Sequence, residues 1–357
     1  MPPCQENSRS FFQILQNADG LDLRDSRGKR HDLAVVLVGV TLAILSNRDG
    51  NLSSIQRHLK NHYEKLVTVL GVAPKRAVSR SQLPLILEHV AFQVFDKLLF
   101  ESFGIKLSEG ERKWFALDGK ELRGSIEKGF KRGEAVVQAV THENCQPVAQ
   151  DYYSGEKESE VPIVRKILEE GEFASQKISL DALHCKPLTL AIISEKQGKY
   201  LVGLKENQKE LKKRINWAMK KQAILCQMAR VEKSHGRIEV REYEFYDVLE
   251  LEKAERWKTC QIKTAIKVTR EREELKSGKN SREESYYLSN EVGNYEELAQ
   301  AIRQHWQVET NNHIRDVSLR EDKMRSKKRV YKKQWRESEL WQRVFWRKPG
   351  VKTKKPN

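Results

Sequence analysis

Cysteine is scarce in this chain of 357 residues: only five are present, and no two are spaced as a C-x-x-C pair. That spacing indicates neither a zinc site nor a disulfide framework, so we expect reduced thiols. Long hydrophobic runs are also lacking. The most apolar stretch, 33–45, is interrupted by Gly39 and is shorter than the roughly 20 residues that a membrane-spanning helix needs. We therefore expect it to form a buried core helix.

Acidic residues are outnumbered, with 50 Asp and Glu against 66 Lys and Arg, which gives a formal net charge of +16. An excess of this size favours a polyanionic partner, either a nucleic acid or an anionic membrane, and does not specify the fold. The first residues are polar and do not resemble a secretory signal. The composition is typical of a cytoplasmic protein that binds nucleic acid, and we expect it to be associated with the nucleoid.

The hydrophobic pattern changes period near residue 105. Before that point, apolar residues recur at steps of three and four, which predicts a helical N-terminal domain over residues 1–105. After it, three strand-like segments precede a helix and an alternation of strands and helices. The three strands are expected at Lys113–Asp118, Glu134–Thr141 and Pro147–Tyr153. This order is that of a ribonuclease H-like mixed sheet, although it also suits other α/β domains.

A highly charged segment, about residues 206–283, interrupts the alternation. Two strand-like stretches within it, Arg237–Val248 and Gln261–Val268, predict a largely β insertion. The α/β domain is expected to span 106–325 with this insertion. Residues 326–357 form a basic segment rich in aromatic residues and poor in aliphatic ones. Three interpretations stay open for this segment: contact with single-stranded nucleic acid or a flipped base, a disordered solvated tail, or a frameshifted end.

Three carboxylates stand in distinctive settings. Asp118 and Asp181 each close an apolar strand-like run, and Glu309 lies in an expected helix that includes Ile302–Glu309. Singly, these residues have ordinary explanations as a turn former, a cap and a solvated helix residue. Together, two Asp at the ends of two strands and a Glu on a later helix could hold Mg²⁺ or Mn²⁺, because hard carboxylate oxygens suit these ions. Two such ions could clamp a phosphodiester.

The helix around Glu309 carries two further candidates. His305 and Asp316 follow the same three- and four-residue spacing and would share a face with Glu309. They would support the metal ligands from behind. The alternative is an amphipathic surface helix with a His–Glu pair.

Basic residues near these motifs are candidates for phosphate contacts. Lys120 and Arg123 follow Asp118 closely, and Arg237 and Arg241 would share one face of a strand. Guanidinium groups match phosphate oxygens well, so the two arginines could bind successive phosphates. The alternative for them is the charged outer face of an edge strand.

Several motifs, in order, resemble those of bacterial insertion-sequence transposases of the H-repeat-associated type, which belong to the DDE class. The resemblance runs from about Phe11 to Arg325. It is carried by Ala116–Ser125, Ser179–His184, Gly203–Gln208, His235–Arg241, His305–Glu309, Asp316–Val317 and Arg320–Asp322. Around the Glu, the wider class often has Tyr, Arg and Lys where Ile302, His305 and Asp316 stand here.

The resemblance implies a ribonuclease H-like core with Asp118, Asp181 and Glu309 as catalytic residues and metal ligands. It implies cleavage at terminal inverted repeats that depends on Mg²⁺, then attack of the freed 3′-OH on target DNA. The implied partners are double-stranded DNA and other copies of the chain in a synaptic complex, and the N-terminal helices would bind transposon ends. Two rival hypotheses are a decayed or domesticated transposase that only binds DNA, and a nuclease without strand transfer.

Overall fold

The structure, a computed structural model, describes residues 10–46, 52–73, 75–103, 110–123, 126, 132–153, 157–234, 236–248 and 255–317. The segment 326–357, for which a tail or a frameshifted end is expected, lies outside these ranges. So do Gly124, Ser125, His235 and Arg320–Asp322 of the sequence motifs.

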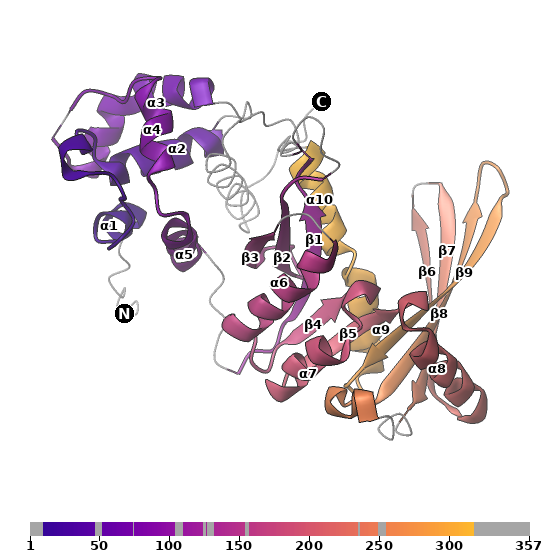
Figure 1. Ribbon diagram of the computed structural model, residues 1–357. Coiled ribbons are helices and arrows are strands. Elements are labelled where there is room, and N and C mark those ends of the chain that lie inside the picture. Colours follow the sequence, from indigo (N-terminus) through magenta and orange to yellow (C-terminus); the bar gives the residue numbers. More distant parts are fainter. Residues whose placement is uncertain are drawn as a thin grey trace, which may run out of the picture.

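Among the described residues before the first strand, five α-helices pack around their own apolar cluster (Figure 1). The longest apolar stretch forms α2, and ten of its fourteen residues are buried, as expected for a core helix. No helix within the described ranges is long and apolar enough to cross a membrane. The bounds are α1 Phe11–Gln16, α2 Leu33–Ser46, α3 Leu52–Leu70, α4 Gln82–Glu88 and α5 Phe92–Phe103.

The remaining elements build a mixed α/β unit on a nine-stranded sheet in the order β3-β2-β1-β4-β5-β9-β8-β7-β6. Strands β1, β4 and β5 are parallel, and the other neighbours are antiparallel. A mixed α/β fold with a large mixed sheet is thus confirmed. The strands nearest the candidate carboxylates are β1 Trp114–Glu121, β2 Ala135–Thr141, β3 Pro147–Tyr153, β4 Lys177–Leu180 and β5 Lys199–Leu204.

The charged segment after β5 extends this sheet, because β9 pairs directly with β5. It also holds a helix and a strand that the sequence did not predict, α8 (Lys209–Lys221) and β6 (Ile224–Ser234). β6 is the outermost strand and is largely exposed, so it lacks the apolar alternation by which strands are recognised. The other strands here are β7 Arg237–Asp247, β8 Thr264–Glu274 and β9 Asn280–Ser289.

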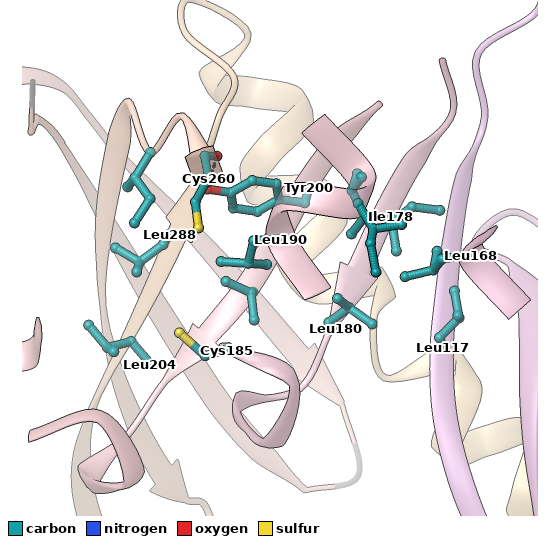
Figure 2. Packing of buried hydrophobic residues seen from close by; sticks show 14 of the residues in the cluster. Leu117, Leu168, Ile178, Leu180, Cys185, Leu190, Tyr200, Leu204, Cys260 and Leu288 are labelled. Carbon is teal, nitrogen blue, oxygen red and sulfur yellow. Dashed lines mark hydrogen bonds between the residues drawn. The ribbon is translucent and has the colours of Figure 1, made fainter. Parts of the chain in front are cut away.

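Alternating residues of each strand point to opposite faces of the sheet, and each face has its own helices. Phe115 and Leu117 of β1 face a large apolar cluster covered by α6 (Lys157–Glu170), α7 (Pro187–Glu195) and α8. Figure 2 shows the middle of this cluster, where the Tyr200 ring lies beside Leu190 and Cys260. Ala116, between them, packs under α10 (Gln307–Val317), while α9 (Tyr295–Gln304) covers the opposite face of β5 and the later strands. The sheet is therefore the middle of three layers.

Phe115 gives a direct test of this packing. Its side chain is fully buried, and its ring meets Phe173 edge-on with centroids 5.4 Å apart. Phe115→Ala should lower the free energy of unfolding by about 3–5 kcal/mol, because it removes apolar contacts and leaves a cavity. Leu188→Ala, at a side chain that is 56% exposed on α7, should change it by less than about 0.5 kcal/mol. Denaturant unfolding measures both, and equal losses would contradict the described core.

Candidate active site

The pairing of β1 with β4 sets Asp118 beside Asp181. Leu117 pairs with Leu180 in the parallel register, so the next residue of each chain segment is an Asp. Neighbouring strands lie about 4.8 Å apart, which makes the two Asp residues close neighbours on one face. β4 ends at Leu180, but β1 continues past Asp118 to Glu121, three residues further than the sequence predicted. Pairing with β2 sustains this extension.

Asp181 caps the short 3-10 helix 182–184 that follows β4. Its Oδ1 accepts a hydrogen bond of 2.8 Å from the backbone N–H of Leu183, and its side chain stays 46% exposed. The backbone bond fixes one carboxylate oxygen by the local chain. The side chain is therefore oriented by the backbone and remains accessible to solvent.

Helix α10 brings Glu309 to the same place. Val308 is 1% exposed and packs against the fully buried Ala116 and Val140 of β1 and β2, which docks the first turn of α10 on the sheet. One turn further, Asn312 Nδ2 donates a hydrogen bond of 3.2 Å to Asp118 Oδ2. Glu309 itself is exposed beside this docked turn. The expected helix over Ile302–Glu309 is interrupted, because α9 ends at Gln304 and α10 begins at Gln307.

The interruption places His305 in a buried polar chain behind β4. Its Nδ1 lies 2.8 Å from Ser179 Oγ, which is also 2.7 Å from Nε2 of His142. Burial lowers the pKa of His305 to about 4, although the charge of Asp181 acts in the opposite direction. Burial likewise lowers the pKa of His142 to about 3. Both rings are therefore neutral at pH 7, and His305 orients the end of β4 without carrying charge.

Asp118 has a strongly raised pKa. Burial, followed in order of importance by the negative charges of Glu160, Asp181 and Glu309, raises its pKa from 3.8 to about 7, although a backbone hydrogen bond from Gly119 acts in the opposite direction. The three predicted residues thus share one electrostatic environment. Among the described residues, no three Asp, Glu, His or Cys side chains are arranged to hold a metal ion. The site as it stands is a group of carboxylates that repel one another.

The comparison with known protein families agrees with this geometry. The transposase DDE domain family matches residues 109–336, which is well over half of the chain. The chain belongs to this family. The resemblance to H-repeat-associated transposases is thereby confirmed, and the family match covers β1, β4 and α10 together.

Curated relatives support the same assignment. The protein named "Putative transposase YncI" of Escherichia coli O157:H7 is 29% identical over 250 residues, which cover 64% of this chain and 62% of that protein. The "H repeat-associated putative transposase YhhI" of Escherichia coli K12 is 29% identical over 228 residues, 60% of this chain and 59% of that protein. The chain therefore spans about three fifths of the length of these relatives.

Sequence reasoning missed one acidic residue of this transposase-family chain, Glu160. It lies in the first turn of α6. Acidic residues are common there because the partial positive charge at a helix N-terminus stabilises a carboxylate. The signal that could have found it is Gly119. A side chain at that position would overlap the Glu160 carboxylate, so the glycine directly after Asp118 has a packing reason.

The predicted phosphate contacts fall into two groups. Lys120 and Arg241 are buried in ion pairs: Lys120 Nζ lies 2.6 Å from Asp316 Oδ1, and Arg241 pairs with Glu232 and Glu239. Arg123 is exposed, and Arg237 is partly exposed. DNA binding by all four stays a prediction, and for Lys120 and Arg241 it requires that these pairs open. Asp316, expected behind the metal ligands, balances the charge of Lys120, and its role behind the ligands stays a prediction.

A larger exposed basic surface lies on α8. Its exposed cationic side chains stand beside Trp217, which is 52% exposed and has Lys221 Nζ 3.9 Å from its ring centroid. The start of α8 is tied to the segment after Asp181, because Asn207 Nδ2 donates to the carbonyl of Ala182 at 2.6 Å. We define the α8 basic surface as the exposed residues Lys209, Lys213, Arg214, Lys220 and Lys221.

Proposed function

We propose that this chain is a DNA transposase that cuts phosphodiester bonds at the terminal inverted repeats of its element and joins the freed 3′ ends to target DNA. The observation that carries the proposal is the convergence of Asp118, Asp181 and Glu309. The β1–β4 register sets the two Asp side by side, and the docking of Val308 brings the Glu beside them. Family membership supplies the reaction class.

The donor types suit a divalent cation, and because no three such side chains among the described residues are arranged to hold an ion, binding requires the three carboxylates to move closer together. Carboxylate oxygens suit Mg²⁺ and Mn²⁺, and the mutual repulsion that raises the pKa of Asp118 would be relieved by a positive charge among the three groups. Two bound ions would activate the attacking hydroxyl and stabilise the leaving oxygen. The hydrogen bonds from Asn312 and from the Leu183 N–H hold Asp118 and Asp181 in place for this role.

The same elements support a finer fold assignment, which is part of the proposal. The order β3-β2-β1-β4-β5, with β1, β4 and β5 parallel, supports a ribonuclease H-like core. In that arrangement, the two Asp lie on its two central strands and the Glu on its last helix. The helices of residues 11–103 pack around a separate apolar cluster, and we propose, from the resemblance to H-repeat-associated transposases, that they contact the transposon ends.

We propose that the α8 basic surface holds the DNA backbone next to the carboxylates. β5 is parallel to β4 and leads through the short 3-10 helix 206–208 into α8, so this surface begins at the same end of the parallel strands as Asp181, although α8 covers the face opposite to α10. Exposed lysine and arginine side chains supply sequence-independent attraction to phosphates.

Removing two charges from this surface should weaken binding without changing the fold. Arg214→Gln with Lys220→Gln should lower DNA affinity several-fold and reduce the slope of log K against log salt by about 2. The control, Lys166→Gln with Lys258→Gln, removes the same charge from exposed sites on α6 and on the 3-10 helix 255–260. Fluorescence anisotropy over a salt series measures both, and equal slopes in the two double variants would contradict the role of α8.

The proposed activity is tested with a supercoiled plasmid that carries the inverted repeats flanking the gene, together with a target plasmid. In Mg²⁺, the wild type should cut at the repeat ends and produce joined donor–target molecules. Cutting without joined products would instead identify a nuclease. Salt-dependent binding without cutting would identify a DNA-binding protein, and either result overturns the proposal.

A further inference from the structure

Glu160 occupies an unusual place for a carboxylate. It projects from the first turn of α6, on the side of the sheet opposite to α10, and its side chain is only 13% exposed. Each of its oxygens is held: Oε2 accepts a hydrogen bond of 3.0 Å from the Tyr153 hydroxyl, and Oε1 lies 2.9 Å from Nε2 of His184. These contacts fix the carboxylate in one orientation.

Gly119 makes room for this carboxylate. A Cβ atom at Gly119 would overlap the carboxylate of Glu160 and would lie 2.8 Å from the Tyr153 hydroxyl oxygen. Glu160 therefore rests against the backbone of β1 at the residue that follows Asp118. No side chain of β1 separates it from the candidate site.

His184 connects Glu160 to the second Asp. The imidazole is fully buried, and its Nε2 lies 2.9 Å from Glu160 Oε1 and 3.8 Å from Asp181 Oδ1. Glu160 is thus adjacent to Asp118 through Gly119 and adjacent to Asp181 through His184. Among the carboxylate charges that raise the pKa of Asp118, that of Glu160 has the largest influence.

We propose that Glu160 is a positioning residue of the candidate active site, a fourth carboxylate that strengthens divalent-cation binding by Asp118 and Asp181 from the opposite face of the sheet. This inference rests on the proposed function. A negative charge fixed beside two others is unfavourable in the metal-free protein and favourable when a cation is bound. Its hydrogen bonds to Tyr153 and His184 hold it where its field reaches both Asp residues.

The test compares Mn²⁺ binding by the full chain and three variants, measured by isothermal titration calorimetry in the absence of DNA. Glu160→Gln should raise the Kd roughly 10- to 100-fold, the range seen when groups that support metal ligands are changed. Glu160→Asp, which keeps the charge but shortens the side chain, should raise it less. Glu169→Gln, on the exposed end of the same helix, should leave it unchanged.

A merely structural role predicts the reverse order, because Gln preserves the shape and hydrogen-bonding reach that Asp loses. Thermal unfolding in EDTA supplies a second readout. Glu160→Gln should unfold at the wild-type temperature or above it, since a repelling charge is gone. A Glu160→Gln protein that binds Mn²⁺ like the wild type, binds it better than Glu160→Asp, or fails to fold in EDTA overturns the inference. If the wild type itself neither binds Mn²⁺ nor cuts DNA, the proposed function fails instead.

Discussion

Asp118→Asn should abolish DNA cleavage and at the same time stabilise the metal-free protein. Loss of a ligand that stabilises charge in the transition state is expected to lower the cleavage rate by roughly 10³-fold or more. The gain in stability has a separate cause. The pKa of Asp118 is raised from 3.8 to about 7 in the folded protein, so ionisation of this carboxyl opposes folding.

The sign of the effect sets its pH dependence. Below pH 3.8 the carboxyl group is protonated in both states, and the ionisation penalty is absent. As the pH rises to about 7, the unfolded chain ionises while the folded protein retains the proton, so wild-type stability falls. Asn cannot ionise, and its advantage should grow over this range to at most about 4 kcal/mol and then stay constant.

Denaturant unfolding in EDTA from pH 4 to pH 8 measures the difference in stability between Asp118→Asn and the wild type. The same measurement is then repeated with Mg²⁺ in place of EDTA. Mg²⁺ should stabilise the wild type and have little effect on Asp118→Asn. Asp19→Asn, at an exposed residue far along the chain from the site, is the control and should match the wild type throughout. An Asp118→Asn protein that is less stable than the wild type at pH 8 in EDTA would argue against the carboxylate group described here.

Val308→Asn should detach α10 and remove activity without touching a carboxylate. Among the described residues, Val308 is the only residue of α10 in the small apolar cluster that it forms with Ala116 and Val140. An amide buried there would lose apolar contact and lack a hydrogen-bond partner, which together cost about 2–5 kcal/mol. Glu309, one residue further, would then no longer be held beside Asp118. We expect cleavage to fall by at least about 100-fold.

Hydrogen exchange identifies the cause. Amides of residues 307–317 should exchange faster in Val308→Asn, while those of β1 and β4 remain protected. Thr310→Asn, two residues on at an exposed position of the same helix, should keep both the protection and the activity. Unchanged exchange in α10 of Val308→Asn would show that this contact does not hold the helix.

The sequence could predict the elements that obey local rules. Apolar runs ending in Asp118 and Asp181 marked β1 and β4, and the buried helix α2 followed from its apolar stretch. What escaped prediction depends on tertiary contacts. The extension of β1 to Glu121 depends on pairing with β2, and β6 is a strand because β7 pairs with it along its length. The local sequence of a strand does not reveal which other strand pairs with it.

Some residues of the candidate site could likewise be predicted from the sequence, and others could not. The three carboxylates were recognisable because each stands in a distinctive motif, whereas Glu160 stands in an ordinary helical turn and is significant only through Gly119 and His184. The break before α10 was hidden because apolar spacing continues across His305. The buried pairing of Arg241 with Glu239 was hidden because a charged strand face normally indicates solvent.

The central claim is that Asp118, Asp181 and Glu309 close together on divalent cations. Crystals grown with Mn²⁺ and measured at the manganese absorption edge test it directly, since the anomalous signal locates the ion independently of the protein. The account predicts Mn²⁺ within about 2.0–2.6 Å of carboxylate oxygens from all three residues, counted over one or two ions. Manganese bound elsewhere, or no manganese at these three side chains at millimolar concentration, would contradict it.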